Sequence, residues 1–115
     1  MPKKFSATNA SRKFLESEGW TVGSVEQTIP HTFIKRDLFG FADLIACSPT
    51  RGIMLVQVTA GLSTSNGNAR VAKIKAEPRA AIWLASGGRI QVHSWQGKGK
   101  NRDCFMRDII KEQLP

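Results

Sequence analysis

Two apolar segments of the chain, 41–47 and 53–59, carry polar side chains that could do chemistry together. Asp43 lies within FADLIAC, and Gln57 and Thr59 end the run IMLVQVT. A carboxylate in such a segment is costly to bury unless it has a partner or binds a metal. Side chains two residues apart in a strand share a face, so pairing of the two strands would bring these three side chains to one edge of a sheet. Oxygen ligands of this kind suit a hard cation such as Mg²⁺.

This arrangement resembles the signature of the PD-(D/E)XK nuclease superfamily, a β-hairpin that carries Asp, then a short turn, then a strand with (D/E)-x-K. Ala42-Asp43 stands at the Pro-Asp position, and Gln57-Val58-Thr59 stands where (D/E)-x-K would be. The segments RDLFGFADLIA, LVQVT and ARVAKI also resemble small phage and bacterial proteins near the Holliday-junction resolvase and VRR-Nuc branches. The resemblance covers roughly residues 10 to 95.

The resemblance implies a site for one Mg²⁺ or Mn²⁺ ion. Its expected ligands are Asp43, Glu26, the side-chain oxygen of Gln57 and the carbonyl of Val58. Resolvases often carry a metal-binding Glu at the start of the first helix, whereas this chain reads TNAS at 8–11, so Glu26 is the expected substitute. When bound, such an ion would polarise a phosphodiester and lower the pKa of a water molecule.

Two positions depart from the pattern of the superfamily. Gln57 can offer an oxygen but brings no charge, which weakens the expected affinity for a cation. Thr59 replaces the lysine that would orient the attacking water or stabilise the developing negative charge. Arg70 and Lys73, three residues apart on a predicted helix, lie on one helical face. We expect Lys73 or Arg70 to fill the vacancy, and we count Asp43, Gln57, Thr59, Lys73 and Glu26 as the candidate catalytic residues.

Structural roles for the same residues stay open at this point. Asp43 could form an ion pair with Arg36 or Arg70 instead of holding a metal. Lys73 could lie on a solvated helix face, and for Glu26 the structural interpretation is slightly favoured over the functional one. Asp37 is expected to be an ordinary loop residue, with an indirect supporting role as the alternative. His93 is predicted at a surface or edge position of its strand.

The charge of the chain favours a polyanionic partner. Seventeen Lys and Arg against nine Asp and Glu give a formal charge of +8 at pH 7. The excess is clustered, which is typical of nucleic-acid binding. We therefore expect duplex or branched DNA as the partner, although no feature distinguishes DNA from RNA. The candidate contact residues are Arg36, Arg70, Lys98, Lys100 and Arg102.

Several other classes of protein are disfavoured. The chain has no run of about 18 apolar residues and no apolar segment of a signal peptide near its start, so we expect a cytoplasmic protein without a membrane partner. Cys47 and Cys104 have no CxxC partner and are expected to be small core residues. The loop AGLSTSNGN lacks the G-K-[ST] ending of a nucleotide-binding P-loop.

The predicted elements form a single α/β domain over residues 1–115. Caps and turn residues indicate the helix and strand boundaries, and the helix after the third strand predicts a crossover to a neighbouring strand. The predicted order is αβββαββα, a restriction-endonuclease-like core with a mixed sheet flanked by helices. Helices are expected at 8–18, 69–77 and 102–113, and strands at 20–27, 41–47, 53–59, 80–85 and 89–95.

Three hypotheses for function follow from these expectations. The first is a Mg²⁺-dependent DNA endonuclease that hydrolyses phosphodiester bonds, with junction-resolvase-type selectivity and a homodimer as its expected form, since a junction offers two symmetric strands. The second is a nuclease-fold module that binds DNA without cutting it. The third is a phage-type interaction or inhibitor protein whose basic surface binds an acidic protein.

Overall fold

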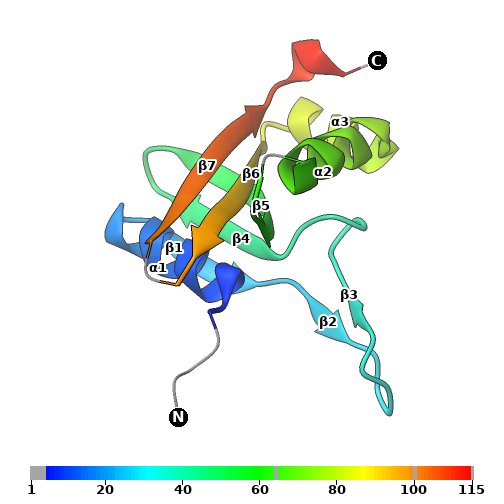
Figure 1. Cartoon of the computed structure of the whole chain (residues 1–115). Helices are drawn as coiled ribbons and strands as arrows, with labels where there is room; N and C mark the ends of the chain where they lie inside the picture. Colours follow the sequence, from blue (N-terminus) through cyan, green and yellow to red (C-terminus); the bar gives the residue numbers. More distant parts are fainter. Residues whose placement is uncertain (1–4, 64, 100, 115) are drawn as a thin grey trace.

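The computed structural model describes residues 5–63, 65–99 and 101–114. The elements follow one another as shown in Figure 1. The helices are α1 (Ala7–Ser17), α2 (Ser65–Ala76), α3 (Pro78–Ala85) and the short 3₁₀ helix η1 (Lys111–Gln113); the strands are β1 (Thr21–Ser24), β2 (Gln27–Thr28), β3 (Lys35–Arg36), β4 (Leu44–Ser48), β5 (Gly52–Gly61), β6 (Arg89–Lys98) and β7 (Asn101–Ile109).

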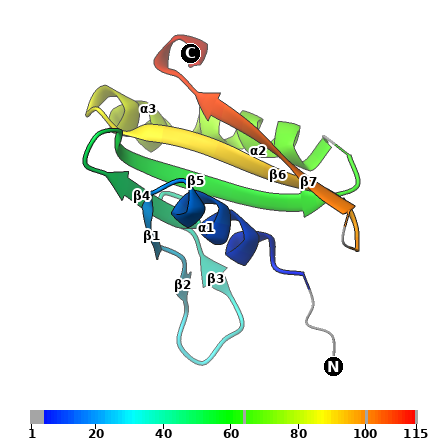
Figure 2. The ribbon, with the colours of Figure 1, turned by 90° about the vertical axis from the view of Figure 1, so that its left-hand side faces the viewer.

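Five of the strands form one mixed sheet in the order β1-β4-β5-β6-β7. Strands β5 and β6 are parallel, and the other neighbouring pairs are antiparallel. The parallel pair requires a crossover, which α2 and α3 provide. Figure 2 shows the sheet nearly edge-on, with α1 on one side and α2 and α3 on the other. The α/β class and the mixed sheet flanked by helices are as predicted.

Alternation along β5 divides the core into two layers. Met54 and Val56 pack with Leu15 of α1 on one face of the sheet. Leu55 packs with Ile74 of α2 on the other face. Both faces of β5 are therefore buried, as its nearly continuous apolar run predicts. Gln57 and Thr59 share the α2 face with Leu55, because side chains alternate along a strand.

A second, two-stranded sheet of β2 and β3 forms an arm that projects from the body (Figures 1 and 2). We refer to residues 25–38 as the arm. The sequence predicted one strand over 20–27 and a loop over 28–38, whereas the chain leaves the main sheet after Ser24 and forms its own short hairpin. Phe33 near its tip is 103% exposed.

The predicted strand at 80–85 is wrong, because this segment is helix α3. Pro78 occupies the first turn, where a missing N–H costs nothing, and the Glu77 side chain caps it by accepting from the Arg79 N–H at 3.0 Å. A run of six apolar residues is too short for periodicity to separate strand from helix. In the helix, Ala80 is buried and Ile82 faces solvent.

The predicted helix at 102–113 is also wrong, because most of it is strand β7. The prediction rested on the pairs Phe105/Ile109 and Met106/Ile110, each one helical turn apart. A spacing of four is also an even number, so each pair equally shares one face of a strand. Gly97 and Gly99 adopt φ of 114° and 61°, which lets the chain reverse tightly and pair β7 with β6.

The remaining boundaries differ less. Helix α2 begins at Ser65, four residues before the predicted start at 69, and ends at Ala76 before Pro78.

None of the described helices is long and apolar enough to span a membrane. Both cysteines are free, and Cys47 is exposed, contrary to the expectation of a core position.

Candidate functional site

Asp43 lies directly before β4, at the point where β4 and β5 begin to pair. Its backbone N–H donates to the Val56 carbonyl at 2.9 Å, which fixes its position beside β5. Its carboxylate Oδ2 accepts from the Val58 N–H at 2.8 Å and from Gln57 Nε2 at 3.0 Å. Asp43 is 6% exposed. The predicted association of Asp43 with Gln57 is therefore present.

Gln57 offers its amide NH₂ to this carboxylate, so its side-chain oxygen points elsewhere. The same Nε2 also reaches the Val58 carbonyl at 3.2 Å. Gln57 is 2% exposed, and its Oε1 has no hydrogen-bond partner among the described residues. A buried oxygen without a donor is costly, so Oε1 is an acceptor that is available to a ligand.

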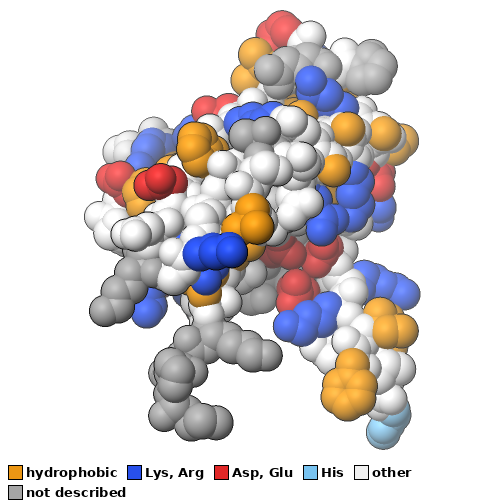
Figure 3. Space-filling view, in the orientation of Figure 1, with side chains coloured by type: hydrophobic (Ala, Val, Ile, Leu, Met, Phe, Trp, Pro, Cys, Tyr) orange, Lys and Arg blue, Asp and Glu red, His pale blue; other side chains and the backbone are white. Residues whose placement is uncertain are grey.

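Two further carboxylates join Asp43. Ligand oxygens of Glu26, Asp37 and Asp43 all lie within 4.8 Å of one another; we call these three residues the acidic group. Glu26 lies between β1 and β2, and Asp37 directly follows β3. The acidic group therefore sits where the arm joins the sheet, and Figure 3 shows acidic side chains gathered there with Lys and Arg side chains on both sides.

Asp37 reaches the acidic group through a tight turn over 38–42. Leu38 and Ala42 exchange backbone hydrogen bonds of 3.0 and 2.9 Å. Phe39 and Gly40 adopt φ of 55° and 78°, which closes the turn and brings Asp37 back beside Asp43. The sequence predicts Asp37 as an ordinary loop residue, with an indirect supporting role as the alternative, and the structure brings its carboxylate into the acidic group. The signal was the Phe39-Gly40 pair between two aspartates, which is typical of a turn.

Burial raises the pKa of Asp43 to about 7, because the ionised carboxylate loses water. The Val58 N–H opposes this rise by stabilising the charge. The carboxyl group of Asp37 raises the pKa further by repulsion and by a shared hydrogen bond, and the charge of Glu26 adds to the repulsion. Ionisation of Asp43 therefore has a cost, from burial and from the neighbouring carboxylates, that a bound cation would relieve.

Cationic side chains surround the acidic group. Lys35 Nζ pairs with Glu26 Oε1 at 3.3 Å. Arg36 and Asp37 line one open hollow of about 480 Å³, which Arg79 also borders. None of the ion pairs among the described residues includes Asp43, so the alternative of a pair with Arg36 or Arg70 is not what the structure contains.

The other predicted catalytic and metal-binding residues are not members of the acidic group. Val58 contributes its N–H to Asp43, while its carbonyl accepts from Gln57. Thr59 is buried on the same face as Gln57 and is aligned with Ser94 of β6. Lys73 is exposed on α2 and lines a hollow of about 210 Å³ with Phe41, two residues before Asp43. Arg70 is half-buried on α2.

Glu77, the last residue of the helix predicted over 69–77, lies beyond the end of α2. It caps α3 instead and forms a bidentate pair with Arg79, with Arg79 NH2 at 2.8 Å from Glu77 Oε1. This pair lowers the pKa of Glu77 to about 2 through the hydrogen bonds of the Arg79 side chain and backbone. The Glu77 carboxylate therefore stabilises the start of α3.

The predicted nucleic-acid contacts fall into two places. Arg36 lies on the arm beside the acidic group. Lys98 ends β6, four residues beyond Ser94, at the end of the sheet toward which β5 and β6 run. Arg102 of β7 donates to the Gly99 carbonyl at 2.9 Å and stacks over the Phe5 ring at 3.8 Å. Lys100 lies outside the described residues.

His93 is fully buried, contrary to its predicted surface position. Its Nδ1 lies 2.8 Å from Ser11 Oγ and its Nε2 lies 2.6 Å from Gln91 Oε1. Burial lowers the pKa of His93 to about 4, partly opposed by the charge of Asp108. Trp95 Nε1 also donates to Ser11 Oγ at 2.8 Å, so these side chains anchor α1 to the sheet.

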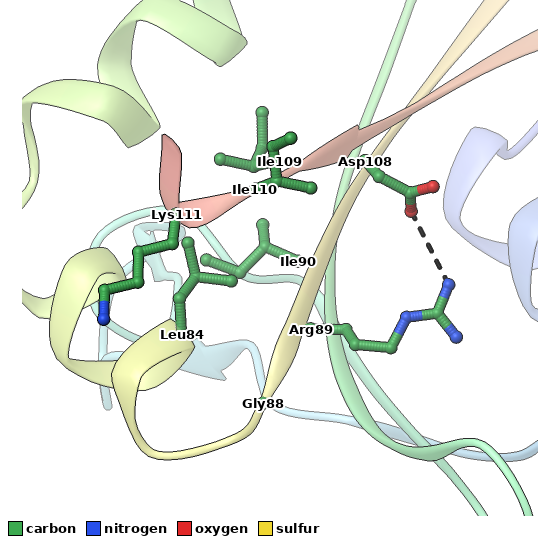
Figure 4. A pocket seen from close by; sticks show the side chains of 8 residues that line it. All are labelled: Leu84, Gly88, Arg89, Ile90, Asp108, Ile109, Ile110 and Lys111. Atoms are coloured by element: carbon green, nitrogen blue, oxygen red, sulfur yellow. Dashed lines mark ion pairs between the residues drawn. The ribbon is translucent and has the colours of Figure 1, made fainter. Parts of the chain in front are cut away.

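An apolar hollow of about 280 Å³ lies between α3, the start of β6 and the end of β7. Figure 4 shows Leu84, Ile90 and Ile109 around this space, with the Arg89–Asp108 ion pair on the other side of the strands. That pair spans 3.7 Å. None of the acidic group lines this hollow, so it belongs to a different part of the molecule.

The residues of the acidic group fit a divalent cation. Three carboxylates of one sign lie close together, and the unpartnered Gln57 Oε1 supplies a buried neutral oxygen beside them. Hard cations prefer such a set of oxygen ligands. Comparison of the chain with models of protein families, with curated proteins and with solved structures finds no match.

Proposed function

We propose that this chain is a divalent-metal-dependent endonuclease of the PD-(D/E)XK type that hydrolyses phosphodiester bonds of DNA. The observation that carries the proposal is the acidic group, in which three separate segments bring Glu26, Asp37 and Asp43 within 4.8 Å. Isolated acidic residues are common on protein surfaces, but Asp43 is buried and held by two hydrogen bonds from β5. Such a constrained carboxylate is typical of a functional site.

The order of elements supports the same assignment. The core of the superfamily has a helix, three strands, a helix and a further strand. In this chain α1 is followed by the antiparallel set β1, β4 and β5, then by α2, and then by β6 parallel to β5. Asp43 precedes the second strand of that set and Gln57 lies on the third, as the resemblance implies. The arm and α3 are additions to this order.

Glu26, Asp37 and Asp43, with the oxygen of Gln57, would hold Mg²⁺ or Mn²⁺. A cation bound there would lower the pKa of a water molecule and polarise the phosphodiester. The Val58 N–H and the Gln57 amide keep the Asp43 carboxylate in one orientation, so this ligand needs no rearrangement on binding. Asp37 takes the place that the sequence analysis gave to the Val58 carbonyl as a further ligand.

Arginine and lysine side chains on the arm and at the end of the sheet would bind the phosphate backbone. Arg36 borders the hollow next to Asp37, and Lys35 pairs with Glu26 at the rim. Lys98 is exposed at the end of β6. Arginine and lysine at such positions fix the register of DNA without reading its sequence. Arg36 is therefore better placed than Lys73 to stabilise charge on a phosphate near the acidic group.

The test combines cation binding with cleavage. Calorimetry with Mn²⁺ and Mg²⁺ and cleavage of labelled four-way-junction, single-stranded and duplex DNA would use wild type, Asp43→Asn, Asp37→Asn and Glu16→Gln. Glu16 is an exposed acid of α1 and serves as the matched control. We expect both aspartate variants to lose cleavage and to bind the cation at least about tenfold more weakly, as loss of metal-site residues typically does.

Other outcomes would favour the other hypotheses. DNA binding that is equal in wild type and Asp43→Asn, without cleavage or cation binding, would identify a DNA-binding module on the nuclease scaffold. The absence of a lysine at position 59 and the exposure of Lys73 favour that second candidate. Failure to bind DNA even at low salt would reject both and favour a partner that is an acidic protein.

A further inference from the structure

Strand β7 is an open edge of the main sheet. It runs for nine residues, Asn101–Ile109, and pairs with β6 on one side. No described strand pairs with its other side. An edge of this length presents a row of free N–H and C=O groups, and proteins usually protect such edges with proline, bulges or short strands. The sequence of β7 contains no proline.

The middle of this edge is apolar on both faces of the sheet. Phe105 is 49% exposed and Met106 is 38% exposed. Adjacent residues of a strand point to opposite faces, so each face carries one of them. Large exposed apolar side chains that are flanked by charges are typical of an interaction site, and at an open edge such a site suits another strand.

The charges that flank this centre are arranged symmetrically. Residues 102–108 read Arg-Asp-Cys-Phe-Met-Arg-Asp. If a second copy runs antiparallel with the two Phe105 residues opposite each other, Arg102 faces Asp108 of the copy and Asp103 faces Arg107 of the copy. Symmetry repeats both pairs, so four opposite-charge pairs flank the Phe105 contact. Directly opposed pairs of this kind stabilise a sheet, and like charges in their place destabilise it.

The backbone restricts the register and thereby makes this match selective. Only alternate residues direct their N–H and C=O groups to the open side, so two copies can pair only when the opposed residue numbers have an even sum. The neighbouring allowed registers are centred on Cys104 and on Met106. They place Arg102 opposite Met106 or Ile110 and lose every Arg–Asp pair.

We propose that two copies of this chain associate through β7 into a continuous ten-stranded sheet, with Phe105 at the two-fold axis. The contacts within one copy leave the necessary atoms in place. Asp108 uses Oδ1 both for Gln91 and for Arg89, at 3.0 and 3.7 Å, so Oδ2 can accept from the copy. Arg102 uses Nε for the Gly99 carbonyl, so its terminal nitrogens can donate.

The two-fold axis of this pairing is perpendicular to the sheet, so the α2 faces of both copies lie on the same side. The two acidic groups would open on that side, about 34 Å apart, because seven strand spacings of about 4.8 Å separate the two copies of β4. The dimer itself does not depend on the proposed nuclease activity, and its test uses neither DNA nor metal.

The first test exchanges the charges of one pair. Asp103→Arg places Arg opposite Arg107 of the copy, and Arg107→Asp places Asp opposite Asp103 of the copy. Each single variant is expected to raise the dissociation constant of the dimer by about tenfold or more, measured by sedimentation velocity over micromolar to millimolar concentrations. The two single variants mixed together, and the double variant, restore opposite charges and are expected to dimerise again.

The second test fixes the register. Phe105→Cys in a Cys47→Ser, Cys104→Ser background places two thiols directly opposite, at a Cα separation of about 4.5 to 5.5 Å that suits a disulfide. Oxidation is expected to give a covalent dimer. Thr21→Cys on β1, the other edge of the sheet, is the matched control and is expected to stay monomeric.

A monomeric wild type across the concentration range would overturn the proposal. A dimer that both single charge variants leave intact, or that mixing the two variants fails to restore, would overturn the β7 register. A covalent dimer of Thr21→Cys, without one of Phe105→Cys, would place the contact at β1 and not at β7. Loss of cleavage in Asp43→Asn bears on the proposed function alone, because it changes no residue of β7.

Discussion

Asp43 and His93 are two buried ionisable side chains whose pKa values move in opposite senses for one physical reason. Burial disfavours the charged form, so the pKa of the acid rises to about 7 and the pKa of the base falls to about 4. Both side chains are therefore neutral in the metal-free protein between these values. The hydrogen bonds of His93 are compatible with the neutral ring, because Nε2 donates to Gln91 Oε1 and Nδ1 can accept from the Ser11 hydroxyl.

The Asp43 pKa predicts that the contribution of this side chain to the stability of the metal-free protein falls as pH rises. Between the ordinary value of 3.8 and about 7, the folded protein binds more protons than the unfolded chain, so the free energy of unfolding falls as pH increases. The full difference corresponds to roughly 4 kcal/mol. Asp43→Asn is expected to remove this contribution, so the free energy of unfolding of wild type relative to that of Asp43→Asn should fall between pH 5 and pH 8, as urea denaturation in a chelator would measure.

The control for this measurement is Glu16→Gln, which removes an exposed carboxylate from α1. It is expected to keep the pH dependence of wild type. An equal pH dependence of stability in wild type and in Asp43→Asn would show that the carboxylate is ionised in the folded protein at neutral pH. Added Mn²⁺ is expected to stabilise wild type more at pH 8 than at pH 5.

His93 predicts the opposite dependence. Its folded pKa of about 4 lies below the ordinary 6.5, so the stability that neutral His93 contributes is complete above pH 6.5 and is lost as pH falls toward 4. The loss is roughly 3 kcal/mol. The free energy of unfolding of wild type relative to that of His93→Asn is expected to fall between pH 7 and pH 4, measured by urea denaturation, because the variant lacks this acid-sensitive contribution, even if it is less stable at every pH.

His31→Asn provides the matched substitution at an exposed histidine. His31 adopts φ of 64°, a backbone conformation that Asn tolerates well, so the exchange should not strain the chain. It is expected to retain the acid sensitivity of wild type. If His93→Asn retained that sensitivity as well, the neutral state of buried His93 would be wrong.

For single residues, the sequence predicts contacts between side chains of one hairpin, but it does not predict contacts that depend on other elements. Asp43 and Gln57 were predicted to meet because strand alternation and a short turn determine their relation. Asp37 was missed because its position depends on the turn at 38–42 and on the arm, which no periodicity indicates. His93 was misplaced because the cover that α1 gives to that face of the sheet is a tertiary contact.

The arm is the element whose exposure most invites a functional test. Phe33 is 103% exposed, so it contributes little to folding, and Lys35 and Arg36 follow it within three residues. An aromatic side chain beside cations can stack on an unpaired base. Phe33→Ala is expected to weaken binding of junction and single-stranded DNA by about tenfold, as fluorescence anisotropy would measure, with the free energy of unfolding unchanged within about 0.5 kcal/mol.

Ile82→Ala is the control for the arm, since Ile82 of α3 is also strongly exposed and apolar. It is expected to leave DNA affinity unchanged. Equal losses of affinity in Phe33→Ala and Ile82→Ala would mean that general surface hydrophobicity is responsible, and no loss in either would remove the arm from the interface.

Among the elements, those with a single dominant signal were predicted and those with an ambiguous one were not. Strand β5 was predicted by its long apolar run, and α1 by Gly19 after its end, although its N-cap is Ser6 and not the expected Thr8 or Asn9. Helix α3 was predicted as a strand because a run of six apolar residues fits both periodicities. Strand β7 was predicted as a helix because a four-residue spacing fits both as well. Pro78 after Glu77 was the overlooked signal for α3, since both favour the start of a helix.

The charge of the whole molecule predicts how DNA binding responds to salt. With a formal charge of +8, affinity is expected to fall as salt rises, because bound phosphates release counterions. Arg36→Ala and Lys98→Ala are each expected to reduce the slope of log affinity against log salt by about one unit. Phe33→Ala is expected to lower the affinity without changing that slope. Slopes that are identical in all three variants would exclude Arg36 and Lys98 as phosphate contacts.

The single parallel pairing of β5 with β6 also determines how the chain can reach its final structure. Strand β4 joins β5 through a short turn and β6 joins β7 through a tight reversal, so these two pairs need mainly local contacts, while the arm intervenes between β1 and β4. The parallel ladder connects residues about 35 positions apart, such as Met54 and Arg89. Contacts between distant residues slow folding because a long loop must close first. The rate of folding should therefore follow the closure of the α2–α3 crossover, while the residues that hold Asp43 already lie together on the earlier, local set of strands.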